Sequence, residues 1–109
     1  MADTPKFLGT TTSATATNLY DNGATAGTYT VVGSVTLCNT SATTDYTVTL
    51  SVSTSTGAHG AYVLSSYSVA AGSTTAVQLG IVLDTTRRYL VANTSNTAVH
   101  VTAFGVTGP

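Results

Sequence analysis

Charged side chains are scarce in this 109-residue chain, and glutamate is absent. They make up 6% of the residues, against roughly 25% in an ordinary soluble domain. Binding to nucleic acid needs clustered Lys and Arg, so a formal net charge of −1 argues against such a partner. The charged residues are Asp3, Asp21, Asp45, Asp84, Lys6, Arg87 and Arg88.

Long apolar runs and cysteine pairs are also missing. No stretch approaches the about 20 apolar residues of a membrane span, and the opening MADTPKFLGTTTSATATN lacks the apolar core of a signal peptide. The single cysteine, Cys38, excludes a disulfide within the chain. We therefore expect no membrane partner, and synthesis in a cytoplasm without export.

The residues needed for catalysis or metal binding are few and scattered. Cys38 could act as a nucleophile with His100 as its base, but we favour a small buried side chain at a strand end. His59 and His100 are far apart in the sequence, whereas zinc takes three or four ligands. The sequence predicts no enzyme, no cofactor and no metal.

Apolar and polar residues alternate with a period of two along most of the chain, in segments rich in Thr, Val and Tyr. In DYTVTLSVS, Val48, Leu50 and Val52 fall on one face and hydroxyl side chains on the other. TTAVQLGIVL alternates in the same way, and AVHVTAFGV puts His100 and Phe104 on one face. About seven such segments predict an all-β protein, a single sandwich of antiparallel strands that is immunoglobulin-like or jelly-roll-like.

The segment TVVGSVTLC is expected to form a strand that precedes DYTVTLSVS. Its alternation places Val31, Val35 and Leu37 on one face. Glycine inside a strand often marks a bulge or a close approach of another backbone, so we expect one of the two at Gly33.

Two segments of the chain echo one another. CNTSATTDYTVTL and ANTSNTAVHVTAF share the frame N-T-S-x-T followed by an alternating strand, with Asn39 and Asn93 in the leading position. N-T-S also matches the glycosylation acceptor pattern, but an unexported chain does not meet the enzyme. We read both segments as the turn of one kind of hairpin, built once in each half of the sandwich.

The first residues differ from the rest in their weak periodicity. Residues 1–13 contain Pro5 and are expected to form an N-terminal arm or tail, ahead of a sandwich domain at 14–109. Such an arm would order against a partner. Its candidate contacts are Lys6, Phe7 and Leu8.

Arg87 and Arg88 are a second candidate contact, because they are two of the three positive side chains. Arginine binds carboxylates well through two parallel hydrogen bonds, which suits docking onto an acidic partner. The alternative is a solvated turn in which an arginine pairs with Asp84.

The order of these segments resembles a group of small tailed-phage structural proteins. The resemblance rests on a V-C-N-T-S-like turn, V-A-A-G-x-T at 69–74, a G-L-V-L-like strand at 80–83 and A-V-H-V-T-x-x-G-V at 98–106. It covers residues 28–106 and implies a β-sandwich subunit of a virion. The sequence departs from the pattern at DTTRRYL, where such proteins usually have an acidic, glycine-containing turn.

The resemblance implies a head decoration, or cement, protein that binds the outer capsid surface and stabilises contacts between major capsid subunits. Its partners would be the major capsid protein or another virion protein, and its own copies in a homo-oligomer, with a trimer favoured. A tail, collar, baseplate or fibre-adaptor component is the first alternative. A carbohydrate- or host-surface-binding module is the second.

Overall fold

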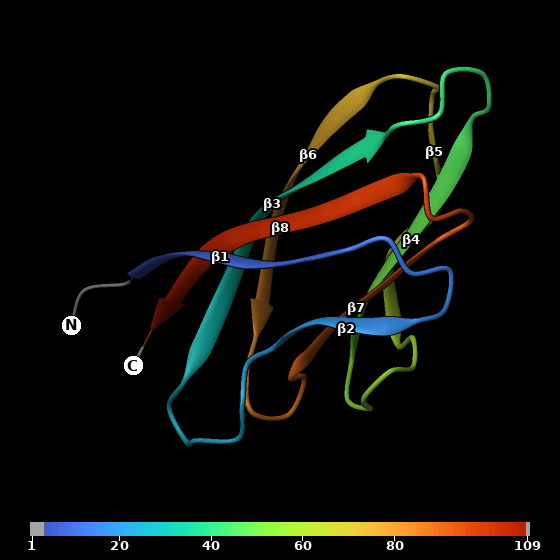
Figure 1. Ribbon diagram of the computed structural model, residues 1–109. Helices are drawn as coiled ribbons and strands as arrows, with labels where there is room; N and C mark the ends of the chain where they lie inside the picture. Colours follow the sequence, from blue (N-terminus) through green and yellow to red (C-terminus); the bar gives the residue numbers. More distant parts are fainter. Residues whose placement is uncertain (1–3, 109) are drawn as a thin grey trace.

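The computed structural model describes residues 4–108, and every helix or strand in this range is a β-strand (Figure 1). The strands are β1 (Thr4–Thr11), β2 (Thr17–Asp21), β3 (Tyr29–Asn39), β4 (Tyr46–Ser53), β5 (Ala61–Val69), β6 (Thr74–Leu83), β7 (Tyr89–Thr94) and β8 (Val99–Gly108). The all-β prediction is confirmed, with eight strands in place of about seven. The additional strand, β1, lies within the segment expected as an arm. Residues 1–3 of that arm and residue 109 of the expected domain lie outside the described residues.

Two four-stranded antiparallel sheets form the sandwich. Sheet A has the order β1-β8-β3-β6, and sheet B has the order β2-β7-β4-β5. The chain changes sheet at every connection except the one between β4 and β5. Eight strands connected in this way form a jelly roll, in contrast to the seven-stranded immunoglobulin arrangement. The topology therefore decides between the two expected sandwiches.

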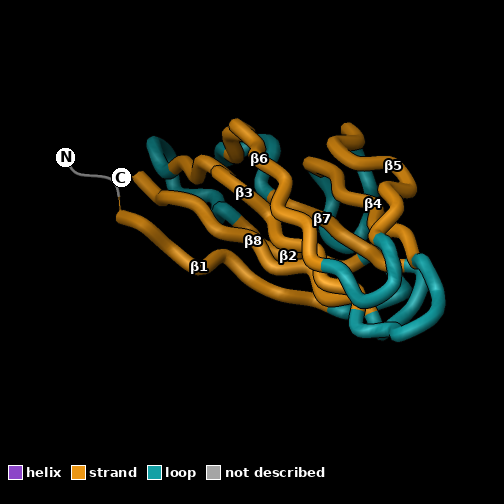
Figure 2. Tube along the Cα trace, turned by 90° about the horizontal axis from the view of Figure 1, so that it is seen from above, coloured by secondary structure: helices purple, strands orange, loops and turns teal. Residues whose placement is uncertain are grey.

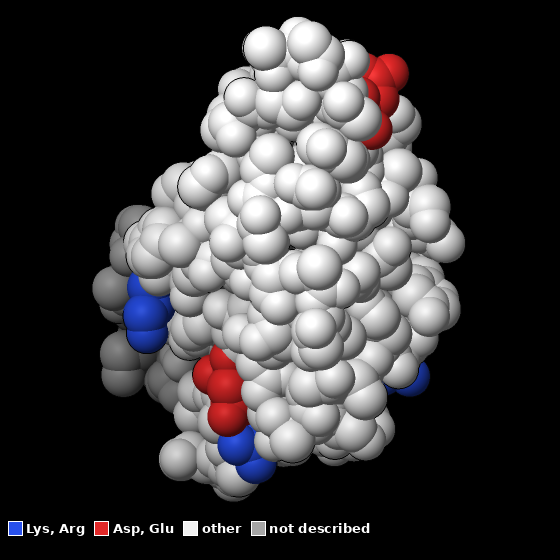
Figure 3. Space-filling view, turned by 45° about the vertical axis from the view of Figure 1, so that its right-hand side comes forward, with Lys and Arg blue, Asp and Glu red and all other residues white. Residues whose placement is uncertain are grey.

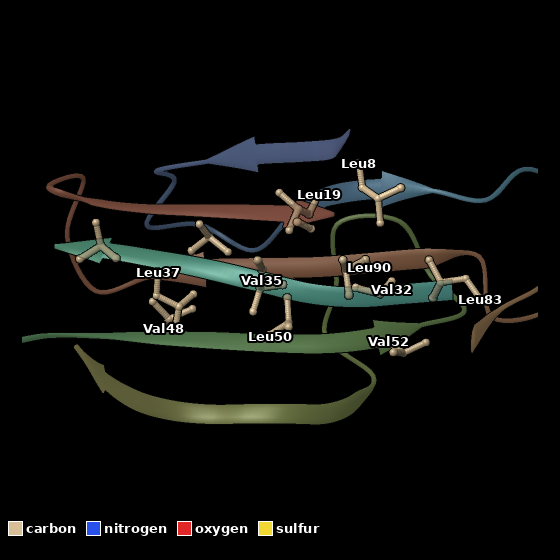
Figure 4. Packing of buried hydrophobic residues seen from close by; sticks show 14 of the residues in the cluster. Leu8, Leu19, Val32, Val35, Leu37, Val48, Leu50, Val52, Leu83 and Leu90 are labelled. Atoms are coloured by element: carbon tan, nitrogen blue, oxygen red, sulfur yellow. The ribbon is translucent and has the colours of Figure 1, made fainter. Parts of the chain in front are cut away.

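The core lies between the two sheets and consists largely of valine and leucine (Figure 4). Val35 and Leu37 of β3 and Val48 and Leu50 of β4 are fully buried there. Each such side chain contributes about 1.5–3 kcal/mol through its removal from water. The alternation expected for TTAVQLGIVL is also present, because β6 alternates between exposed and more buried side chains along its length.

A bulge at Gly33 exchanges the two faces of β3. The register with β6 and with β8 shifts between Val32 and Ser34, so of the two features expected at Gly33 the bulge is present. Its consequence differs from the prediction, because Val32 is fully buried and Val31 is only half-buried. Placing Val31 on the same face as Val35 is therefore wrong, since one irregular residue reverses the alternation beyond it.

The two N-T-S segments connect different sheets, so the hairpin prediction is wrong. One leads from β3 in sheet A to β4 in sheet B, and the other leads from β7 in sheet B to β8 in sheet A. The two crossings lie side by side: the Thr40 amide donates to the Ala98 carbonyl, and the Ser95 amide donates to the Thr47 carbonyl, each at 2.9 Å. The sequence pattern of a turn followed by a strand does not distinguish a hairpin within one sheet from a connection that crosses to the other sheet.

The two leading asparagines play different parts in these crossings. Asn39 is buried, donates from its amide nitrogen to the carbonyls of Thr44 (2.9 Å) and Val69 (3.0 Å), and accepts from the Ser41 amide (3.0 Å). Its side chain therefore stabilises the first crossing from inside. Asn93 lies within β7, and its side chain contacts His59 instead.

The two long sides of the sandwich differ in how closely the sheets approach. β1 and β2 contact each other on one side, whereas β5 and β6 diverge on the other (Figure 2). Gly9 permits the close approach, because a Cβ atom there would overlap the carbonyl oxygen of Leu19. On the divergent side, Val77, Leu79 and Ile81 of β6 face the core but remain only partly buried.

Candidate functional site

The outer face of sheet A carries a cluster of apolar side chains. Phe7 of β1 is paired with Phe104 of β8, and their rings meet edge to face with centroids 5.8 Å apart. In the next row, Val106, Val31 and Val82 are aligned across β8, β3 and β6. We call these five residues the sheet A patch.

The sheet A patch is open to solvent. Phe7, Phe104 and Val82 are 56%, 41% and 57% exposed. Hydroxyl side chains continue the same face, with the hydroxyls of Thr10 and Thr102 only 3.2 Å apart. Contiguous exposed apolar side chains bordered by polar ones are typical of an interaction surface, whereas single exposed ones are common on any protein.

The charge on the surface is low, as the composition predicts. Figure 3 shows a face of the molecule that is almost entirely white, with blue and red atoms confined to a few small areas. A partner that docks on such a surface is recognised by shape and apolar contact more than by charge, because long-range steering needs clustered charges.

Part of the outer face of sheet B, around Ser51 of β4 and Val91 of β7, is covered by the connection between β4 and β5, residues 54–60, which we call the covering loop. Asn18 of β2 holds this loop at two atoms: its amide nitrogen donates to Thr56 Oγ1 (2.6 Å), and its amide oxygen accepts from the Gly57 amide (2.8 Å). Val91 of β7 pairs with Asn18 across the strands. It is fully buried although it lies outside the core cluster, which indicates that the loop shields this face from water.

His59 fixes the covering loop to two strands of sheet B. Its Nδ1 lies 2.6 Å from Ser51 Oγ on β4, and its Nε2 lies 2.6 Å from Asn93 Oδ1 on β7. Because an amide oxygen only accepts, Nε2 carries the proton, and Nδ1 accepts from the Ser51 hydroxyl. The order Ser–His–Asn is that of a nucleophile with its base. Ser51 is fully buried, however, so its oxygen faces no substrate and the three residues act as a clamp.

The three candidate contacts near the N-terminus have different environments. Phe7 belongs to the sheet A patch. Leu8 sits at a register shift between Phe7 and Gly9 and is buried in the core of this chain. Lys6 is exposed, with its Nζ 5.5 Å from the centre of the Tyr20 ring on β2. The structure brings Phe7 together with other exposed apolar side chains, and it does not do so for Lys6 or Leu8.

Arg88 is paired with Asp21 and not with Asp84, the partner named in the alternative hypothesis for this turn. Its Nε and Nη2 donate to the two carboxylate oxygens of Asp21 at 3.0 and 2.8 Å. Asp84 turns back into its own loop and accepts from the backbone amides of Thr86 (2.9 Å) and Arg87 (2.8 Å). A local turn of this kind is the usual role of aspartate at a loop start.

These contacts change the pKa values of the groups involved. The hydrogen bond from the Arg88 side chain is the main cause of the lowered pKa of Asp21. The backbone amides of Arg87 and Thr86 lower the pKa of Asp84. In return, the hydrogen bond to Asp21 raises the pKa of Arg88.

Of the two arginines proposed to dock onto an acidic partner, Arg88 is paired within the chain. Arg87 is exposed, so it is the arginine to which the docking hypothesis still applies.

Cys38 lies near the end of β3, directly opposite His100 on β8. The strand-end position is as expected, but the thiol is half-buried on the outer face instead of buried in the core. Cys38 and His100, the nucleophile and base of the catalytic hypothesis, are therefore neighbours on adjacent strands. The described aspartates that could orient the base bind elsewhere: Asp21 binds Arg88, Asp84 binds its own loop, and Asp45 accepts from a backbone amide.

Sequence reasoning missed both the sheet A patch and the clamp at His59. The placement of Phe104 and His100 on one face is confirmed, since both are exposed on β8. The pairing of Phe104 with Phe7 depends on a strand inside the expected arm, so alternation alone does not reveal it. For His59, a glycine on either side of the segment A-H indicates a loop, but nothing indicates where that loop lies.

Residues 4–108 contain no group of three or more His, Cys, Asp or Glu side chains that could hold a metal ion. The same residues enclose no pocket. In this described range no helix has the length and apolar character needed to cross a membrane. The candidate site is therefore a surface and not a cavity.

Comparison with known proteins assigns no family. No family model matches the chain, and no curated protein matches its sequence. Two crystal structures of a pentameric capsid protein isolated from metagenomic phage sequences are distantly similar, each with 18% identity. Their TM-scores are 0.41 and 0.31, and both matches cover 96% of this chain. The chain spans 58% and 59% of the length of those two proteins.

Proposed function

We propose that this chain is a structural subunit of a tailed-phage particle, and that it decorates the outside of the head. In this role it binds the outer capsid surface and stabilises contacts between major capsid subunits. The observation that carries the proposal is a jelly roll, an architecture found in viral capsid domains, with one bare apolar outer face. The low charge supports it as well, because copies crowded on a shell repel one another little.

The sheet A patch is the docking surface in this proposal. Phe7 and Phe104 supply flat, apolar area, and Val82 extends it to the edge strand β6. A subunit whose patch rests on two neighbouring capsid subunits buries apolar area on both, so their separation requires that area to be exposed again. Removing apolar area from water yields about 25 cal/mol per Å², and a stable protein interface buries roughly 1,600 Å² in total.

The experiment is a binding assay on particles of the phage that encodes the chain, prepared without this protein. Added wild-type protein should bind all over the shell, and Phe104→Ser should reduce binding at least about tenfold, because aromatic anchors dominate such interfaces. Tyr62→Ser is the matched control, since Tyr62 is a 62% exposed aromatic on β5, away from the patch. Equal loss with both variants would refute the docking surface. Binding only at a tail or a vertex would favour the tail, collar, baseplate or fibre-adaptor function instead.

Carbohydrate binding is the second candidate, and the exposed tyrosines of β5 favour it. Tyr62 and Tyr67 are 62% and 37% exposed, and the Tyr62 ring lies 5.4 Å from the His59 ring. Flat aromatic side chains of this kind can stack on sugar rings. Titration of the purified protein with host surface glycans tests this function: binding that Tyr62→Ser abolishes would support it, and no binding would count against it.

A further inference from the structure

We propose that the free edge of β6 is a self-association surface, where β6 of one chain pairs antiparallel with β6 of a second copy. This inference goes beyond the decoration function and does not depend on it. It concerns the edge of sheet A, whereas docking on a capsid uses the outer face of that sheet. The contact would make one continuous eight-stranded sheet from the two four-stranded sheets A.

Three of the four edge strands carry features that hinder pairing with another chain. β1 contains Pro5 and Lys6 and is irregular at Leu8. β2 is five residues long and is irregular at Leu19. In β5 the register with β4 shifts twice, and Ser66 has a left-handed φ of 49°. A strand added to any of these edges would meet a missing donor, a charge or a bend.

β6 is much less protected. Its ten residues include no proline and no charged side chain. Its one irregularity lies opposite Gly33, which leaves Thr74–Gln78 in unbroken register with β3. A long, uncharged edge of this kind is a template for another strand.

The inner face of β6 also lacks cover. Val77, Leu79 and Ile81 point toward the core, yet they remain partly exposed because β5 and β6 diverge. A neighbouring strand with the same alternation would place its own apolar side chains beside them. This partial exposure of core-facing residues is independent of the edge hydrogen bonds, and it points to the same missing neighbour.

The occupant that fits this edge best is β6 itself. A partner strand must offer a regular and unprotected free edge, carry no opposing charge and alternate in the same sense, and the other described edges fail the first condition. In an antiparallel pair centred on Ala76, Thr75 lies opposite Val77 of the second copy, so core-facing residues meet core-facing residues. On the outer face, Ala76 lies opposite itself and Thr74 lies opposite Gln78. The contact is two-fold and self-complementary.

The expected contact is weak in dilute solution. A single pair of short strands buries less than the about 1,200 Å² at the low end of specific interfaces. We therefore expect a monomer–dimer equilibrium that depends on concentration. On a particle surface, where neighbouring copies are held close together, the same contact would gain from the high effective concentration.

The first test places charges at the centre of the proposed pair, in purified protein. Ala76→Lys and Ala76→Glu each put like charges directly opposite one another, so each variant alone should dimerise about fivefold less strongly or worse than the wild type. Mixing the two variants should restore dimers, because opposite charges then meet. Thr10→Lys and Thr10→Glu are the matched controls, since Thr10 is exposed on the protected edge β1. The masses are measured by sedimentation equilibrium over a range of concentrations.

The second test is covalent. In a Cys38→Ser background, Ala76→Cys should form a disulfide-linked dimer under mild oxidation, because directly opposite residues bring their Cβ atoms within bonding range. Thr10→Cys in the same background should remain monomeric.

Wild-type protein that stays monomeric at high concentration would overturn the proposal. So would a mixture of Ala76→Lys and Ala76→Glu that fails to re-associate. A three-chain mass would overturn the two-fold contact and favour the trimer expected from the resemblance. Ala76→Lys also separates this proposal from capsid docking, because the sheet A patch is intact in that variant. It should bind capsids even though it no longer dimerises.

Discussion

The two outer faces of the sandwich come from strands with the same alternation, yet sheet A exposes apolar side chains whereas sheet B is covered around Ser51 and Val91. On sheet A, Phe104 and Val82 stand in solvent. On sheet B, Val91 and Ser51 occupy equivalent outward positions and are fully buried. The difference comes from the covering loop, which Asn18 and His59 hold against the strands. Strand alternation therefore decides which way a side chain points, and the loops decide whether water reaches it.

Breaking the clamp at His59 should have the largest effect on this difference. We expect His59→Ala to lower the free energy of unfolding by about 2.5 kcal/mol, because buried Ser51 and partly buried Asn93 each lose a partner. Urea unfolding measures the change. His100→Ala, on the exposed face of β8, is the control and should change stability by less than about 0.5 kcal/mol. Equal effects of the two histidine variants would show that the covering loop contributes nothing.

Shortening a valine on each face should sharpen the comparison. We expect Val91→Ala to lower the free energy of unfolding by about 1.5–2 kcal/mol, because it removes buried methyl groups and leaves a cavity. Val82→Ala removes the same atoms from a side chain that is 57% exposed, so the loss should stay below about 0.5 kcal/mol. Thermal unfolding of the two variants in dilute solution checks the difference. Similar losses at both positions would mean that the sheet A patch is covered in solution.

The ion pair at the margin of sheet B should have the smallest effect, and it depends on pH. The pKa of Asp21 is lowered in the folded chain by Arg88, so the pair stabilises the fold above the ordinary aspartate pKa of about 4. That contribution is lost as pH falls through the lowered pKa. The side chains of Arg88 and Asp21 are 30% and 41% exposed, so solvent screens the pair. Unfolding of Asp21→Asn and wild type should therefore differ slightly at pH 7 and coincide at the acid end. A difference that grows on acidification would contradict this assignment.

The alternation of β4, β6 and β8 could be predicted because each strand has one apolar face over most of its length. The core position of Val32 could not be predicted in this way. The register shift at Gly33 reverses the alternation, and the types of the neighbouring residues do not indicate that reversal. The two N-T-S crossings illustrate a second limit. Local turn chemistry at Asn39 was recognisable, but the sheet that receives the next strand is chosen by packing.

The candidate site was less predictable than the fold for a related reason. Phe7 was singled out with Lys6 and Leu8 as part of an expected arm, and β1 instead places each of the three in a different environment. Ser51, His59 and Asn93 come from two strands and a loop that are distant in the sequence. No spacing rule connects them. They come together only because two strands pair in a particular register and a loop folds over those strands.

The place of β8 in sheet A has a consequence for how the chain acquires its structure. β8 lies between β1 and β3, although it is the last strand in the sequence. The first strand therefore has no neighbour in its own sheet until the last one arrives. Contacts between such distant segments slow folding, because long loops must close before the pairing is gained. The β1–β8–β3 part of sheet A should consequently form late, whereas β3 and β6 can pair before β8 arrives, and a chain that is shortened before β8 should leave β1 unpaired.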